Sequence, residues 1–318
     1  MQTKAKKPVI VIGGPTASGK SATALDIARE FDGVIINADS MQIYDGLRVV
    51  TARPSVEDEA LAPHRLYGVM DPSETCSAGY WEKLCVAEIE NVWAEGKLPV
   101  VTGGTGLYIK TLVEGISQLP PIPEEIRTQI RRRADEDGIE VLYAELQAKD
   151  SEMAARLKPR DAQRICRALE VLEATGTSLA VLQREIKPEP ALDAAFMTDV
   201  IMPPRDILYK RCDMRFDLML EEGAIEEVTA LDKLKLDGKL PIMKALGVPE
   251  LLSYVRGEAT LEEARDLAQM QTRRFAKRQC TWFRNQIKQC EIHSAQYSES
   301  LRDEIYKKIR QFLLTYSL

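Results

Sequence analysis

A glycine-rich segment near the N-terminus carries the residue types that bind phosphate groups. Residues 14–21 read Gly14-Pro15-Thr16-Ala17-Ser18-Gly19-Lys20-Ser21, which fits the pattern G-x-x-x-x-G-K-[ST] of a P-loop. In this pattern backbone N–H groups and a helix N-terminus surround a di- or triphosphate, and the lysine ammonium adds a positive charge. The hydroxyl of Ser21 is the expected ligand of a phosphate-bound Mg²⁺, the one cofactor that the sequence implies. Because the pattern is complete and lies between an apolar run and a helical one, it predicts a phosphate-binding enzyme rather than a glycine-rich turn without a ligand.

Two polar side chains follow predicted strands and could meet a bound phosphate. Asp39 comes after the strand predicted for residues 33–37, and Thr105 after the strand predicted for residues 99–102. Ligands of open parallel sheets bind at the carboxyl ends of the strands. Asp39 could be a metal ligand, a general base or the cap of the next turn. Thr105 could donate its hydroxyl to a phosphate or only shape its glycine-rich turn.

Basic residues gather in one part of the C-terminal region. Residues 267–290 hold six basic residues and no acidic one. At helical spacing one face collects Arg274, Lys277, Arg278, Thr281 and Arg284, and aromatic residues are interleaved with it. Such a stripe suits an RNA backbone, with an aromatic ring for a base, but it is also typical of a solvated helix face.

A second basic stripe lies in the middle of the chain. Arg160, Arg164 and Arg167 are spaced i, i+4, i+7, with Gln163 beside them, and Arg127 adds a cation earlier in the chain. The opposite side of the same predicted helix is apolar, so the stripe faces outward.

Three arginines follow the last predicted strand. Arg205, Arg211 and Arg215 could reach back over the phosphates as a lid does in nucleotide kinases, or they could make surface ion pairs.

Strands that alternate with helices must position these residues. Short β-branched runs predict strands at residues 7–12, 33–37 and 99–102, and apolar stripes of helical period predict helices at 20–31 and 78–94. This alternation is typical of an α/β fold with a P-loop NTPase-like parallel sheet and flanking helices.

The pattern changes in the middle of the chain. Prolines in residues 118–123 mark a linker, and prolines in 187–190 mark a second boundary. Between them residues 124–184 read as helix only, with breaks at Gly138 and Gly176. Residues 196–202 return to a strand, and the rest reads as helical, with a capping box at Thr260. We therefore expect an all-helical insertion in the α/β core and a helical C-terminal part. The predicted divisions are 1–118 for the first part of the core, 119–190 for the insertion and 191–318 for the completion of the core.

Composition narrows the class of protein. The chain has 318 residues, with 43 Lys and Arg against 49 Asp and Glu, and 45% of its residues are hydrophobic. This is ordinary globular composition, and a net charge of −6 argues at first against a nucleic-acid partner. No apolar run is long enough for a membrane span or a secretory signal, so we expect a cytoplasmic protein with no membrane partner. No run of heptads predicts a coiled coil, which favours a monomer.

The number and spacing of the cysteines and histidines argue against a zinc site. The six cysteines form no C-x-x-C pair, and only two histidines are present. A four-ligand zinc set at the usual spacing cannot be assembled from them.

Taken together, these segments resemble the bacterial tRNA dimethylallyltransferases, also called isopentenyltransferases. Besides the P-loop, the resemblance is carried by residues 39–44 (Asp39-Ser40-Met41-Gln42-Ile43-Tyr44), 51–54, 103–108, 161–170 and 277–284. These segments span residues 13–284 in the family's order. The first of them and the Gln163 to Glu170 segment are far more specific than the P-loop.

The resemblance implies a reaction and a role for each segment. A dimethylallyl group would pass from its diphosphate to the exocyclic amine of the adenosine 3′ of a tRNA anticodon. Asp39 would be the general base and Thr105 the second catalytic residue, while the P-loop, Mg²⁺, Arg211 and Arg215 would hold the pyrophosphate. The anticodon stem-loop of tRNA would be bound by Asp39, Ser40, Met41, Gln42, Thr105, Arg127, Gln163, Arg164, Ile165, Cys166, Arg167, Lys277, Arg278, Gln279, Thr281, Trp282 and Arg284.

Two other functions compete with this interpretation. A small-molecule P-loop kinase would use ATP, with Asp39 binding metal or deprotonating a hydroxyl. An RNA-binding switch protein would use the P-loop only to sense a nucleotide. Neither explains residues 39–42 together with both basic stripes.

Overall fold

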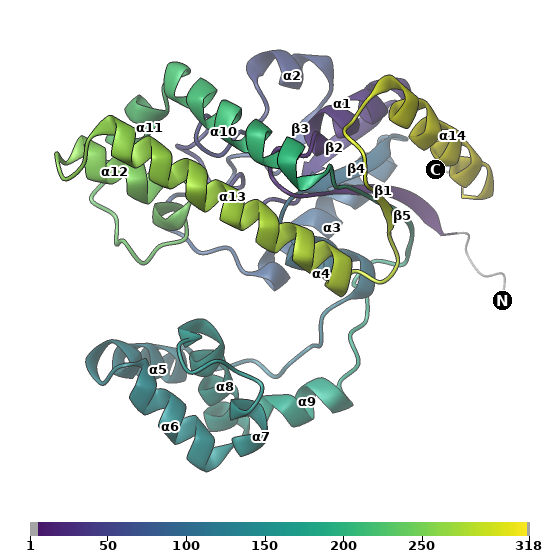
Figure 1. Cartoon of the computed structure of the whole chain (residues 1–318). Coiled ribbons are helices and arrows are strands. Elements are labelled where there is room, and N and C mark those ends of the chain that lie inside the picture. The colour runs from purple at the N-terminus through teal and green to yellow at the C-terminus, as the bar shows by residue number, and fades with distance from the viewer. Residues whose placement is uncertain (1–5, 317–318) are drawn as a thin grey trace, which may run out of the picture. The chain divides into compact units, whose positions relative to one another are not determined.

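The computed structural model describes residues 6–316. The chain divides into two compact units, one made of Met1–Val113 with Pro190–Leu318 and the other of Glu114–Glu189 (Figure 1).

The first unit is built on a six-stranded sheet in the order β3-β2-β4-β1-β5-β6, and all its ladders are parallel. The strands are β1 (Lys7–Gly13), β2 (Gly33–Asn37), β3 (His64–Arg65), β4 (Leu98–Gly103), β5 (Ala194–Ile201) and β6 (Glu291–His293). The predicted parallel sheet is confirmed. The prediction that everything after residue 202 is helical is wrong for residues 291–293, because a three-residue edge strand owes its conformation to its neighbour β5 rather than to its own sequence.

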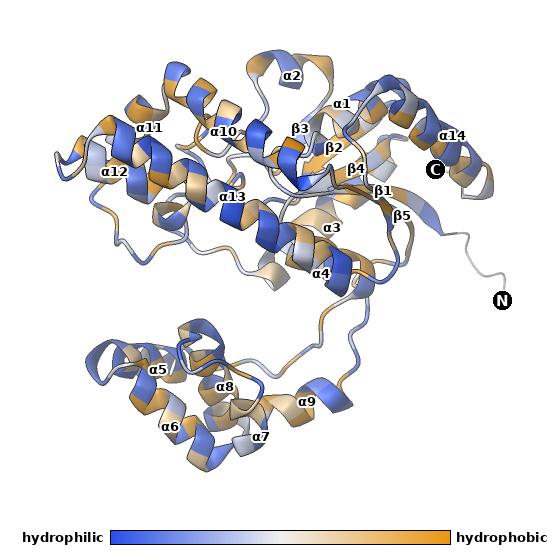
Figure 2. Ribbon diagram, in the orientation of Figure 1, coloured by the Kyte–Doolittle hydropathy of each residue, from blue (hydrophilic) through white to orange (hydrophobic). Residues whose placement is uncertain are grey.

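Helices cover both faces of this sheet. They are α1 (Lys20–Glu30), α2 (Val56–Leu61), α3 (Ala78–Ala94), α4 (Gly106–Glu114), α10 (Arg205–Glu221), α11 (Ala224–Lys233), η1 (Ile242–Lys244), α12 (Val248–Val255), α13 (Leu261–Gln286) and α14 (Glu299–Thr315). Along β1, Val9 and Val11 pack in the cluster that includes α3 and α13, whereas Ile10 and Ile12 pack with α1 and α14. Alternation along a strand therefore decides which helix meets which face. Figure 2 shows the helices with hydrophilic and hydrophobic residues interleaved, as amphipathic helices require.

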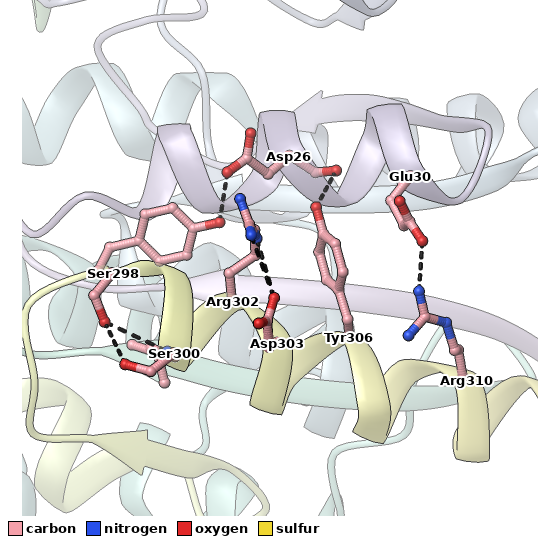
Figure 3. A network of polar contacts seen from close by, with 10 residues as sticks. Asp26, Glu30, Ser298, Ser300, Arg302, Asp303, Tyr306 and Arg310 are labelled. Carbon is pink, nitrogen blue, oxygen red and sulfur yellow. Dashed lines mark hydrogen bonds and ion pairs between the residues drawn. The ribbon is translucent and has the colours of Figure 1, made fainter.

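The last helix, α14, is fastened to α1 by polar contacts (Figure 3). The hydroxyl of Tyr297, just before α14, donates to Asp26 Oδ2 at 2.7 Å, and the hydroxyl of Tyr306 on α14 donates to the Asp26 carbonyl at 2.8 Å. Further along, Arg310 forms an ion pair with Glu30 at 2.5 Å. Since α1 begins in the P-loop, α14 supports the helix that presents the phosphate site.

The second unit is helical, as predicted for the insertion, and an isolated β-bridge joins Ile116 to Glu189 where the chain enters and leaves it. Its helices are α5 (Glu124–Glu136), α6 (Ile139–Lys149), α7 (Ser151–Ala154), α8 (Ala162–Thr175) and α9 (Leu179–Glu185). The predicted breaks hold, because Gly138 precedes α6 and Gly176, at φ +67°, ends α8. The unit has its own apolar core, which includes Ile130, Leu142 and Leu169.

Candidate active site

The P-loop occupies the turn between β1 and α1. A Cβ on Gly14 would lie 2.5 Å from the carbonyl oxygen of Ile201 on the neighbouring strand, so only glycine fits there. The Lys20 ammonium donates to the Pro15 carbonyl at 3.2 Å. Burial lowers the pKa of Lys20 to about 8, although the nearby Asp39 carboxylate acts to raise it.

A cavity of about 670 Å³ opens beside the P-loop, large enough for a diphosphate and its substituent. Its lining joins the P-loop and α10: Ala17, Ser18, Gly19, Lys20, Ser21, Ala22, Arg211, Met214, Arg215, Asp217, Leu218 and Glu221.

Two of the three predicted lid arginines lie at this cavity. Arg215 hydrogen-bonds the Thr16 hydroxyl, and burial lowers the pKa of its guanidinium, which nonetheless stays protonated. The Arg211 guanidinium nitrogens lie 3.8 Å from the position that a Cβ on Gly19 would take. Arg205 is exposed and is not part of the lining. One helix thus brings two cations to the P-loop.

The side-chain oxygen atoms beside the P-loop are suitable ligands for a magnesium ion. The Ser21 side chain is exposed at the cavity, and the buried Ser18 hydroxyl has no hydrogen-bond partner among residues 6–316. The carboxylates of Asp217 and Glu221 belong to the same lining. Oxygen ligands of this kind, completed by phosphate oxygens and water, are those that Mg²⁺ prefers.

A different set of potential metal ligands lies at the edge of the sheet, where β5 pairs with β6. Ligand atoms of Asp199, Glu291 and His293 lie within 4.8 Å of one another. His293 Nε2 lies 2.5 Å from Asp199 Oδ1, and Glu291 is paired with Lys308. These contacts account for the cluster as a buried histidine–aspartate pair beside a surface ion pair.

The loops that carry Asp39 and Thr105 contact each other because β2 and β4 are neighbours in the sheet. Asp39 Oδ1 accepts from the Met41 N–H at 3.0 Å, and the Asn37 side chain brackets the Asp39 backbone. Thr105 Oγ1 accepts from the Ser40 N–H at 2.9 Å and donates to the Ser40 hydroxyl at 3.1 Å. One Asp39 oxygen therefore caps the turn. Among residues 6–316 no hydrogen bond to the other Asp39 oxygen, Oδ2, is found. Thr105, through its two hydrogen bonds with Ser40, holds the loop that carries Asp39.

The loop after Asp39 is held from two sides. Gln42 Nε2 donates to the carbonyls of Thr51 and Ala52 at 2.8 and 2.9 Å. The Glu227 carboxylate, from α11, accepts from the N–H groups of residues 48–50 at 2.7, 2.8 and 3.0 Å. Sequence reasoning missed Glu227, because nothing local marks an acid that binds a loop so far away in the chain.

The outer face of α13 is basic, as the stripe predicts. Arg274, Lys277, Arg278, Thr281 and Arg284 are all exposed. A cavity of about 500 Å³ lies along this face. Its lining is Arg274, Lys277, Arg278, Thr281, Trp282, Asn285 and Gln286.

The aromatic ring of this face is fixed by a glycine. A Cβ on Gly106 would lie 2.1 Å from the ring of Trp282, so the ring packs directly on the start of α4. The half-buried indole remains part of the cavity lining. Its position lets the ring present an edge or face to a ligand.

Gln279 is buried instead of exposed like its neighbours in the stripe, and its predicted contact with tRNA stays a prediction. Only 6% of its surface is exposed. Its Oε1 accepts from the Thr16 N–H at 2.8 Å, and its Nε2 donates to the Gly104 carbonyl at 2.8 Å. The one-letter pattern places Gln279 beside the stripe, but the helix turns it toward the P-loop.

In the second unit α8 carries the other predicted stripe. Gln163 and Arg164 are exposed, with Arg164 3.6 Å from Asp161, and Arg167 is paired with Glu170 at 3.5 Å. Cys166 is half-buried.

Two other residues of this unit that are predicted to contact tRNA are partly or wholly buried. Arg127 is half-buried and paired with Glu124 at 3.6 Å. Ile165 is wholly buried in the core of the unit, since it points inward on the helix although it stands between two arginines in the sequence. Its contact with RNA stays a prediction.

Comparisons with known proteins agree on one family. The family model "IPP transferase" matches residues 42–286. A "tRNA dimethylallyltransferase" of Rhodospirillum centenum is 54% identical over 283 residues, which are 89% of this chain and 90% of that protein. Another, of Paramagnetospirillum magneticum, is 48% identical over 98% of this chain and 99% of that protein.

Solved structures give the same result. A tRNA isopentenylpyrophosphate transferase from Bacillus halodurans matches with TM-score 0.70 and 30% identity over 96% of both chains. A eukaryotic dimethylallyltransferase, described as acting on tRNA, matches with TM-score 0.82 and 26% identity over 98% of this chain and 81% of its own. Within residues 6–316 no helix combines the length and the apolar character that a membrane crossing requires.

Proposed function

The chain belongs to the IPP transferase family, and from this premise we propose that it transfers a dimethylallyl group from dimethylallyl diphosphate to tRNA. The acceptor is the exocyclic amine of the adenosine that follows the anticodon. The observation that carries the proposal is the position of the Asp39 carboxylate beside the P-loop. A Cβ on Gly104 would lie 3.2 Å from Asp39 Oδ2 and 3.4 Å from the Gly14 carbonyl oxygen. Since the acceptor is tRNA, we expect the protein to act in the cytoplasm. We also expect a monomer, because no run of heptads predicts a coiled coil.

The donor side must stabilise pyrophosphate as it leaves. The allylic C–O bond breaks, and its electron pair goes to a diphosphate oxygen, which raises the negative charge there. The backbone N–H groups of the P-loop, Lys20, Arg211 and Arg215 surround the cavity that would receive it. Ser21 would hold Mg²⁺, which supplies further positive charge to the leaving group when bound.

The acceptor side must remove a proton. The lone pair of an adenine amine is delocalised into its ring, so the amine is a weak nucleophile until it loses a proton. As the new C–N bond forms, that proton passes to a carboxylate, and Asp39 Oδ2 is the oxygen that the turn does not use. Thr105 keeps the Asp39 loop in place through Ser40.

A tRNA ligand explains the exposed cations. The adenine lies in a stacked loop and has to be turned out to reach Asp39. The exposed face of α13 offers cations for phosphates and the Trp282 ring for a base, and Gln163, Arg164 and Arg167 offer further contacts on α8. The net charge of −6 is compatible with this ligand, because the basic face is local.

The test is an assay with Mg²⁺, dimethylallyl diphosphate and an anticodon stem-loop, read by mass spectrometry of the nucleosides. We expect prenylated adenosine from the wild-type protein. Asp39→Asn should lower kcat by about 10²–10⁴-fold, while stem-loop binding persists. Asp45→Asn is the matched control, since Asp45 lies exposed on the same loop.

Two results would contradict the proposal. Phosphoryl transfer from ATP without any prenylated adenosine would favour the kinase. Equal losses of turnover and of stem-loop affinity in Asp39→Asn would mean that Asp39 binds the acceptor and is not its base.

A further inference from the structure

Gln279 connects two loops that come from different strands. Its side chain bonds the P-loop at Thr16 and the loop after β4 at Gly104, with both distances at 2.8 Å. The two partners lie 263 and 175 residues away in the sequence. A primary amide is suited to this role because it donates at one end and accepts at the other.

Each loop that Gln279 holds belongs to a different half of the reaction. Thr16 lies in the P-loop, and its hydroxyl also accepts from Arg215, so this end is on the diphosphate side. Gly104 is on the acceptor side, because a Cβ there would lie 3.2 Å from Asp39 Oδ2. The same Cβ would lie 2.5 Å from Gln279 Nε2, which shows how closely the three groups approach.

We propose that Gln279 is a positioning residue that fixes the distance between the bound diphosphate and the Asp39 carboxylate. The inference rests on the proposed function and deepens it. Group transfer requires the reacting atoms to approach to about 3–3.5 Å, and a displacement of about 1 Å can cost about 100-fold in rate. Loss of the amide would free the P-loop and the β4 loop to move apart without removing any group that touches a substrate.

The first test replaces the amide with an apolar side chain of similar length, Gln279→Met. We expect kcat for prenyl transfer to fall at least tenfold, while the dissociation constants of Mg²⁺-pyrophosphate and of the stem-loop change less than threefold. Gln271→Met is the matched control. Gln271 lies on the same helix and is half-buried, but it belongs to neither cavity lining. The control should keep kcat.

The second test uses Gln279→Glu and measures how its kcat depends on pH, because a merely structural role would not produce such a dependence. An ionised carboxylate still accepts from the Thr16 N–H but sets an oxygen against the Gly104 carbonyl. A protonated carboxyl can donate to that carbonyl as the amide does. The ratio of its kcat to the wild-type kcat should therefore rise as the pH falls.

Three outcomes would overturn the inference while leaving the proposed function intact: full activity of Gln279→Met, an equal loss of kcat in Gln271→Met, or a flat ratio for Gln279→Glu. Absence of prenyl transfer by the wild-type protein would instead refute the proposed function.

Discussion

Lys20 should make pyrophosphate binding depend on pH near 8. Burial of its ammonium lowers its pKa to about 8, so the free protein loses this charge in a range where lysine is ordinarily protonated. A bound diphosphate brings negative charge close to the ammonium and raises its pKa again. The protonated form therefore binds pyrophosphate more tightly, so the affinity is highest below pH 8 and falls as the pH rises above it.

The size of the effect follows from the titration. With a pKa of about 8, Lys20 is protonated in roughly 90% of molecules at pH 7 and in roughly 10% at pH 9. The dissociation constant of Mg²⁺-pyrophosphate should thus rise about tenfold over this interval, equivalent to about 1.4 kcal/mol.

Calorimetric titration at half-unit steps from pH 6.5 to 9.5 measures the dissociation constant of Mg²⁺-pyrophosphate. Pyrophosphate and its magnesium complexes titrate in the same range, so the profile has to be compared with that of Lys20→Arg, whose charge stays constant. The ratio of the two dissociation constants should bend near pH 8. Parallel profiles throughout, or tighter binding by wild type at high pH, would refute the reasoning.

Three further outcomes follow from the same contacts. Gly106→Ala should lower the free energy of unfolding in urea by about 1–3 kcal/mol, because its Cβ would displace the Trp282 ring. The control is Gly79→Ala in α3, which should not destabilise the protein, since no atom lies within 4 Å of that Cβ. Arg278→Ala should weaken stem-loop binding and reduce its salt slope by about 1, and an unchanged slope would make that face merely solvated. Glu227→Gln should cost about 1–2 kcal/mol of stability and speed hydrogen exchange of the three amides that its carboxylate binds, with unchanged exchange contradicting the clamp.

Features encoded within a short window were predictable. The P-loop pattern, the β-branched runs of β1, β2 and β4, and the capping box at Thr260 and Glu263 are all local, and the structure confirms these elements. Glycines at 138 and 176 bound their helices as predicted, since a break in a helix depends on the residue itself.

The direction in which a side chain points from its helix was not predictable from the residue type alone. Ile165 and Gln279 stand among arginines in the sequence, but both point inward on their helices. The edge strand β6 has no strand signal of its own and forms because its backbone can pair with β5.

The residue types of the site are therefore present in the sequence, whereas their juxtaposition belongs to the tertiary structure. Asp39 and Thr105 could be placed near the P-loop from strand order, because parallel strands end at one edge. The contacts of Gln279 with Thr16, of Arg215 with Thr16 and of Glu227 with residues 48–50 join segments 177 to 263 residues apart. No local pattern encodes such contacts, since they exist only once the sheet has brought its loops to one edge and α10, α11 and α13 have packed against them.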